Sequence, residues 1–254
     1  YINWDAYLGS KASEQFSEAN QITRENVSQL TVAWEYHSGN PHPEGRSQIQ
    51  CNPLVIDGVL YGSSPTMKFF ALDATTGKEK WVFDPFADNF KSYGMGVNRG
   101  MAQWQRGEDK RLLVTATNYL YCLDIETGQP IRSFGDSGRV DLKKNLGRNV
   151  ENRVVLANTP GVVFGDLYIL GARLDESSGA APGHIRAYNI LSGELEWIFH
   201  TIPYPGEFGH ETWPEDAWQT IGGANSWAGM SVDEERGIVY VPTGSASYDF
   251  YGAD

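Results

Sequence analysis

Histidine and cysteine, the side chains that most often bind transition metals or act as nucleophiles, are few in this sequence. The five histidines form no HExxH or other zinc-ligand spacing; they are His37, His42, His184, His200 and His210. Cys51 and Cys122 lie far apart and belong to no CxxC or CxxCH motif. We therefore expect the histidines to be ordinary hydrogen-bonded residues, and the cysteines to be buried thiols without a disulfide.

The acidic charge balance of the chain excludes two classes of partner. The formal net charge is −12, and no run of Lys or Arg interrupts the sequence. Nucleic acids and anionic membrane surfaces are bound by clustered positive charge, so we exclude both. No apolar run approaches the ~18 residues of a membrane span, and the first residues lack the regions of a signal peptide. Because a leader or anchor can be removed during maturation, the sequence leaves the compartment open.

A short pattern that recurs three times indicates the elements that must position any site. The copies are ALDATTGKEKW at 71–81, CLDIETGQPIR at 122–132 and AYNILSGELEW at 187–197. Each has Asp or Asn third and Gly seventh, and the last position is Trp in two copies but Arg132 in the middle one. The segment WEYH at 34–37 repeats only the end of the pattern.

The physical unit behind the pattern is a β-hairpin. Its Gly takes positive φ at no steric cost, while the Asp or Asn side chain accepts backbone N–H bonds across the turn. Further strand pairs stand upstream of two copies, at 53–64 and 160–173, and another begins at 231–245. The pattern predicts four-stranded antiparallel sheets, and no competing helical periodicity is long enough.

Sheets of this kind in series predict an all-β fold, a β-propeller whose blades dock through tryptophan. Each Trp would fill the space between neighbouring blades, and its indole N–H would reach a carbonyl of the adjacent motif. We expect a single partial propeller domain over 1–254, the N-terminal part of a longer protein. Its expected parts are a closing strand at 30–38, blades at about 50–84, 100–134 and 155–200, and a partial blade at 220–254.

The ordered series of motifs resembles the quinoprotein dehydrogenases, which depend on pyrroloquinoline quinone (PQQ), and most of all their membrane-type glucose and alcohol dehydrogenase branch. The likeness rests on the motif copies, the triplet Asn98-Arg99-Gly100 and the segments 182–203 and 222–254, and it covers nearly the whole chain. It implies an eight-bladed propeller, about half of it present here, with PQQ at the ring centre beside Ca²⁺ or Mg²⁺.

The resemblance also implies an activity and a location. Such an enzyme oxidises an alcohol or an aldose sugar by hydride transfer to the quinone and passes electrons to a membrane quinone or a cytochrome. It works in the periplasm, with or without a membrane anchor on a removed segment. The catalytic base of the family falls beyond residue 254, so we expect this chain to hold no catalytic base and to need the remainder of the propeller for activity.

Matching positions imply four cofactor-binding residues. Arg99 falls on the arginine that pairs with the quinone, a task that suits a planar guanidinium. Trp227 falls on the aromatic floor beneath the flat cofactor. Asn225 comes from the same segment and could donate to the cofactor, and Gln50 stands where many relatives have Glu. The alternatives are a surface ion pair for Arg99, blade packing for Trp227 and a backbone contact for Asn225.

Two carboxylates are the metal candidates that the resemblance implies. Asp175 and Glu176 fall near the segment that binds the cation, and hard cations prefer such oxygens. The alternative is a solvated acidic loop. Ser245 replaces an Asn that binds calcium in the alcohol-oxidising enzymes, which puts the coordination in doubt.

Two other classes of propeller compete with the dehydrogenase hypothesis. A non-catalytic scaffold of the outer-membrane assembly type would share the tryptophan motifs without a cofactor. A sugar-binding or lyase-type propeller would place its site in the acidic, aromatic insertion 204–218. Arg99 and Trp227 discriminate among them, because only a cofactor site requires the two to face the ring axis together.

Overall fold

Three four-stranded antiparallel sheets follow one another along the chain in the computed structural model, which describes residues 3–39, 48–86 and 97–249. The first contains β1 (Leu54–Ile56), β2 (Val59–Ser63), β3 (Phe69–Asp73) and β4 (Glu79–Phe83). The second contains β5 (Ala102–Arg106), β6 (Asp109–Ala116), β7 (Tyr119–Asp124) and β8 (Arg139–Asp141). The third contains β10 (Val162–Phe164), β11 (Leu167–Leu170), β13 (Ile185–Asn189) and β14 (Leu195–Phe199). The predicted all-β architecture is confirmed.

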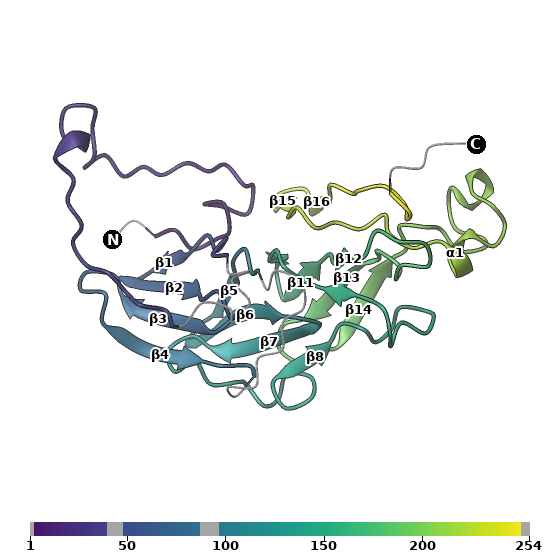
Figure 1. The fold of residues 1–254 in the computed structure, drawn as a ribbon, viewed down its shortest axis with the longest axis horizontal. Coiled ribbons are helices and arrows are strands. Elements are labelled where there is room, and N and C mark those ends of the chain that lie inside the picture. The colour runs from purple at the N-terminus through teal and green to yellow at the C-terminus, as the bar shows by residue number, and fades with distance from the viewer. Residues whose placement is uncertain (1–2, 40–47, 87–96, 250–254) are drawn as a thin grey trace.

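Short elements complete the described fold. Strand β9 (Val155–Leu156) pairs with β12 (Arg173–Leu174), and β15 (Ser231–Asp233) forms a hairpin with β16 (Ile238–Tyr240). The helical turns are η1 (Val27–Gln29), η2 (His210–Thr212) and α1 (Ala217–Thr220). Figure 1 shows the sheets side by side, and the first strands β5, β10 and β15 contact one another in series, as the inner strands of propeller blades do.

The apolar core lies between neighbouring sheets. One cluster joins Phe69 and Trp81 of the first sheet to Leu123 of the second. Another joins Cys122 of the second sheet to Tyr188 of the third. Each sheet therefore buries its faces against its neighbours, which is how a series of blades acquires stability that one blade lacks.

The turn of the repeated motif has the predicted chemistry. In the middle copy, Asp124 Oδ1 accepts a hydrogen bond from the Thr127 N–H at 2.8 Å, and the other two copies make the equivalent bond. Gly128 has φ +69°, and a Cβ atom there would lie 2.5 Å from the Trp81 ring. Only glycine satisfies both the backbone conformation and the close approach.

Tryptophans dock between sheets as the motif predicts. The Trp81 indole N–H donates to the Ile125 carbonyl at 3.1 Å and so joins the first sheet to the second. The Trp34 indole makes the equivalent bond to the Ala74 carbonyl at 3.2 Å on the first sheet. Both acceptors stand directly after the Asp of a motif copy, so the indole is held at the same position of the turn.

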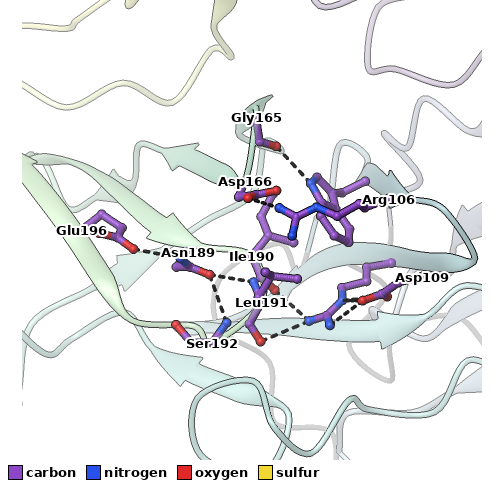
Figure 2. Close-up of polar contacts among 11 residues, drawn as sticks. Arg106, Asp109, Gly165, Asp166, Asn189, Ile190, Leu191, Ser192 and Glu196 are labelled. Carbon is purple, nitrogen blue, oxygen red and sulfur yellow. Dashed lines mark hydrogen bonds and ion pairs between the residues drawn. The ribbon is translucent and has the colours of Figure 1, made fainter.

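The junction between the second and third sheets uses arginine instead (Figure 2). Arg111 of β6 donates to the carbonyls of Ile190 and Leu191 at 2.9 and 3.2 Å, and Ile190 is the third copy's counterpart of Ile125. Asp109 fixes the guanidinium through contacts of 2.8 to 3.1 Å. Arg132, which occupies the motif's Trp position, is exposed and does not take this role.

The expected element boundaries differ from the strands in two places. Residues 30–38 form no strand, because the described part of the chain supplies no neighbouring strand for their backbone. Side chains of this segment still contact the first sheet, where the Tyr36 hydroxyl donates to Glu79 at 2.7 Å. The second sheet continues to Asp141, beyond the expected limit at 134. Residues 250–254 of the expected partial blade lie outside the described residues.

Both cysteines are free, as expected. Cys122 is buried, and burial raises the pKa of its thiol to about 12; Cys51 is half-buried. Among the described residues, every helix is too short and too polar to cross a membrane.

Candidate functional site

A cavity of about 220 Å³ gathers most of the predicted site residues. Its lining comprises Arg99, Arg173, Leu174, Asp175, Glu176, Gly223, Asn225, Trp227, Gly244, Ser245, Ser247 and Asp249. These residues come from the segment before β5, from β12 and the loop after it, and from the segments on either side of the β15–β16 hairpin. Because β5, β10 and β15 are neighbouring inner strands, residues far apart in sequence meet here.

Arg99 and Trp227 both line the cavity and contact one another. The guanidinium carbon of Arg99 lies 5.4 Å from the centroid of the Trp227 ring, within the range of a cation–π contact. Arg99 donates to the Thr159 hydroxyl at 3.2 Å, and that hydroxyl donates to the Trp227 carbonyl at 2.6 Å. Thr159 therefore couples the two loops by accepting from one and donating to the other.

The two members of this pair differ in how firmly they are held. The Arg99 backbone donates to the Asn158 carbonyl at 2.7 Å, and its own carbonyl accepts from the Asn52 N–H at 2.9 Å. The Trp227 side chain, in contrast, is 51% exposed. A large indole with one open face beside a fixed guanidinium is suited to bind a flat anion.

Side chains that carry oxygen atoms also line the cavity. Asp175 is half-buried and accepts from the Ser177 hydroxyl, whereas Glu176 is exposed. The Ser245 hydroxyl donates to Asp249 at 2.7 Å. Within the described ranges, no three His, Cys, Asp or Glu side chains are already arranged as a metal site.

Asn225 and Gln50 have different positions relative to the cavity. Asn225 lines it, and its side-chain amide donates to the Ala172 carbonyl at 2.6 Å, so at least one amide hydrogen is used within the protein. Gln50 is not among the lining residues; its amide donates to Gln48 at 2.6 Å. The structure therefore brings together five of the six predicted residues and leaves Gln50 aside.

Several residues that line the cavity or support its lining escaped the sequence prediction. Arg173 adds a second guanidinium, and its position two residues before Asp175 was a usable signal. Thr159 and Asp249 carry no local signal, because their contribution depends on contacts with Trp227 and Ser245 that lie far away in the chain.

The insertion 204–218 belongs to a separate aromatic cluster. Tyr204 stacks on His200 with a centroid distance of 3.9 Å, and His184 meets His200 edge-on at 4.6 Å. His200 pairs with Glu207 at 2.8 Å. His184 is buried, and neither of its ring nitrogens has a hydrogen-bond partner within the described structure. The expectation of ordinary hydrogen bonding is therefore wrong for His184, whose ring packs edge-on against the rings of His200 and Tyr204.

Comparison with known proteins shows what this chain and its fold resemble. A family model described as "Glucose/ethanol/alcohol dehydrogenase, beta-propeller domain", of the PQQ type, matches residues 4–254. The glycerol dehydrogenase large subunit of Gluconobacter oxydans is 29% identical over 99% of this chain and 35% of its own length. Quinoprotein glucose dehydrogenase A of Acinetobacter calcoaceticus is 27% identical over 99% of this chain and 34% of its own length.

A solved structure gives the same relationship. Quinohemoprotein alcohol dehydrogenase ADHIIG of Pseudomonas putida HK5 superposes with a TM-score of 0.76 at 26% identity, over 96% of this chain and 35% of that one. The chain thus spans about a third of the length of the relatives it matches.

Proposed function

Because this chain belongs to the PQQ-dependent glucose/ethanol/alcohol dehydrogenase β-propeller family, we propose that its cavity binds PQQ in an enzyme that oxidises an alcohol or an aldose sugar. The observation that carries the proposal is the pairing of Arg99 with the half-exposed ring of Trp227 in one cavity. A non-catalytic scaffold gives no reason for that pairing.

The residues on the cavity wall fit a planar, polyanionic quinone. Trp227 would lie against the face of the ring system, and Arg99 would bind its carboxylate or carbonyl oxygens through charge-assisted hydrogen bonds. Arg173 adds positive charge on the same wall. The side-chain amide of Asn225 donates to the Ala172 carbonyl. Asn225 would therefore both hold the segment that carries Trp227 and contact the cofactor. Gln50 stays a proposed contributor with no direct support from the cavity lining.

A divalent cation, Ca²⁺ or Mg²⁺, fits the oxygen-rich side of the cavity. Asp175, Glu176 and Ser245 supply carboxylate and hydroxyl oxygens of the kind that hard cations bind. Bound there, the cation would supply positive charge close to the quinone oxygens.

The division of chemical roles follows from these contacts. When bound, the quinone supplies the acceptor for the hydride that leaves the substrate carbon. The residues of this chain bind and orient that acceptor and exclude water from one of its faces. We assign the catalytic base that takes the hydroxyl proton to no residue of 1–254.

Location and electron transfer are further parts of the proposal. Family membership supports a periplasmic enzyme that passes its electrons to a membrane quinone or a cytochrome. Family membership likewise supports the remainder of a propeller as the structural partner of the sheets described above.

The proposal is tested by measuring how tightly PQQ binds to the full-length protein that contains this chain, after that protein has been prepared without PQQ. Equilibrium dialysis against PQQ with calcium measures the affinity of the wild type and of Arg99→Gln and Trp227→Ala. Loss of a charge-assisted hydrogen bond predicts about a tenfold to hundredfold weaker binding for Arg99→Gln. Loss of the aromatic face predicts about tenfold for Trp227→Ala.

Arg106→Gln is the matched control. The Arg106 guanidinium lies 5.3 Å from the Trp104 ring, so the variant removes the same kind of contact at a place outside the cavity. We expect Arg106→Gln to bind PQQ as the wild type does. Unchanged affinity in both Arg99→Gln and Trp227→Ala would overturn the proposed site.

A further inference from the structure

The N-terminal segment forms a strap across the inner strands. The strap, residues 4–13, is held at one end by Trp4, whose backbone exchanges hydrogen bonds of 2.8 and 2.9 Å with Val55 of β1. At the other end, the Lys11 carbonyl accepts from the Val232 N–H of β15 at 2.9 Å. The strap thus joins the first sheet to the β15–β16 hairpin.

Tyr7 lies between these two anchors and packs against the cofactor-site loops. A Cβ atom on Gly100 would lie 3.0 Å from ring carbon Cδ2 of Tyr7, and one on Gly229 would lie 3.3 Å from ring carbon Cε1. Gly100 directly follows Arg99, and Gly229 comes two residues after Trp227. One aromatic ring therefore contacts the backbone of both loops that present the proposed cofactor ligands.

Tyr7 is not among the residues that line the cavity. Its side chain is half-buried, and that burial raises the pKa of the hydroxyl, while the nearby charge of Arg99 acts in the opposite direction. The hydroxyl is thus within electrostatic reach of Arg99. Thr159, which couples Arg99 to Trp227, also approaches Gly229, because a Cβ there would lie 3.4 Å from its methyl group.

We propose that Tyr7 is a positioning residue of the site: its ring holds the Arg99 and Trp227 loops at the separation that binds the cofactor. This inference rests on the proposed function. The physical reason is that packed atoms transmit small displacements: with the ring removed, the Gly100 and Gly229 backbones lose their common support. The Arg99–Thr159–Trp227 hydrogen bonds alone would then have to hold the two loops.

The experiment compares Tyr7→Ala, Tyr7→Phe and the control Tyr36→Ala in the full-length protein. Tyr36 also packs on an aromatic ring, Phe70 at 4.8 Å, but on the first sheet and outside the cavity. Tryptophans are labelled with 5-fluorotryptophan, and the ¹⁹F resonance of Trp227 is assigned from its absence in Trp227→Phe. In cofactor-free protein, we expect Tyr7→Ala to shift or broaden the Trp227 resonance, and Tyr36→Ala to leave it unchanged.

PQQ affinity is the second readout. Tyr7→Ala should bind PQQ about tenfold more weakly, whereas Tyr7→Phe keeps the ring and should stay within about threefold of the wild type. Thermal melts of the cofactor-free proteins show whether each variant is folded; if Tyr7→Ala is not, Tyr7→Leu takes its place with the same expectations.

Each alternative outcome has a separate meaning. An unshifted Trp227 resonance with wild-type affinity in Tyr7→Ala overturns the positioning role while leaving the cofactor site intact. Loss of affinity in Tyr7→Phe equal to that in Tyr7→Ala overturns it too, because the hydroxyl and not the ring would then be responsible. If Arg99→Gln and Trp227→Ala bind PQQ as the wild type does, the proposed function fails instead.

Discussion

Asp175 and Glu176 are sequence neighbours with different environments. Asp175 is half-buried and receives the Ser177 hydroxyl, whereas Glu176 is exposed and contributes its backbone carbonyl, which accepts from the Asp249 N–H at 3.3 Å. A carboxylate that is partly buried and already oriented loses less entropy on binding a cation. Asp175 is therefore the member of the pair on which the proposed cation site depends more strongly.

We predict that Asp175→Asn weakens calcium binding during reconstitution by about tenfold, because a neutral amide lacks the charge that a hard cation requires. Calcium-dependent recovery of activity, titrated at fixed PQQ, measures the change. Asp216→Asn is the control, since Asp216 precedes α1, lies outside the cavity and makes no side-chain capping bond there. Equal calcium affinity in the two variants would assign Asp175 to a solvated acidic loop.

His184 is a single residue with a consequence for stability. Its burial, together with the positive charges of His200, Arg186 and Arg148, lowers its pKa from the ordinary 6.5 to about 3, and Glu207 opposes this only weakly. The folded protein therefore keeps the ring neutral at pH values where the unfolded chain would protonate it.

The sign of the pH effect follows from proton binding. Between pH 6.5 and about 3, His184 binds a proton in the unfolded state but not in the folded state. Its effect on the free energy of unfolding is therefore absent above pH 6.5, and the free energy of unfolding falls as the pH drops below that value. The expected slope is about 1.4 kcal/mol per pH unit in that range. His184→Phe keeps an aromatic ring and should remove this slope, as measured by urea unfolding at pH 7.5, 6 and 5.

His37→Gln is the comparison for that measurement, because His37 is exposed. The free energy of unfolding of His37→Gln should depend on pH as that of the wild type does. A wild-type slope in His184→Phe would mean that other groups cause the acid sensitivity.

At the scale of elements, three junctions within the described part of the chain are built on one scheme with different side chains. Trp34 and Trp81 donate from an indole, whereas Arg111 donates from a guanidinium that Asp109 fixes. The second and third sheets share a second tie, because the Trp104 indole donates to the Gly165 carbonyl at 3.0 Å. Arg106 also pairs with Asp166 across this junction (Figure 2).

We predict that Arg111→Met lowers the free energy of unfolding by about 1 to 3 kcal/mol, because the buried Ile190 carbonyl and the partly buried Leu191 carbonyl lose their donor. Urea unfolding measures the change. Arg132→Met, at the exposed motif position, should change stability by less than about 0.5 kcal/mol. If the two variants are equally stable, the guanidinium bridge contributes nothing to the junction.

The sheets could be predicted from the sequence because their causes are local. A turn glycine and an Asp or Asn acceptor lie within one short pattern, which a Trp follows in the first and third sheets, and the structure has that turn in each of the three sheets. The exchange of Trp for Arg111 could not be predicted. Arg111 is on β6, well before the motif position at Arg132, and only the packing of two sheets brings it to the Ile190 carbonyl.

At the scale of the whole molecule, the site also contains residues that could be predicted from the sequence and residues that could not. The resemblance to the quinoprotein dehydrogenases predicts Arg99 and Trp227, and the cavity brings them together with Asp175, Glu176 and Asn225. Thr159 and Tyr7 act through contacts between distant segments, which carry no local pattern. The closing strand at 30–38 stays a prediction, because the last blade with which it would pair is not among the described residues; Trp34 docks on the first sheet without that pairing.

The strap has a consequence for the order in which the protein folds. Its Lys11 side chain pairs at 2.6 Å with Glu234, 223 residues later, so the strap's contacts have among the longest sequence separations in the chain. A contact between residues so far apart in sequence requires the closure of a long loop, which costs conformational entropy before the contact stabilises the chain. Such contacts therefore form late in folding. The strap is synthesised before the sheets and must wait for the β15–β16 hairpin before it can dock. Tyr7 lies between the two anchors of the strap, so we expect its contacts with the Arg99 and Trp227 loops to form only after this hairpin has formed.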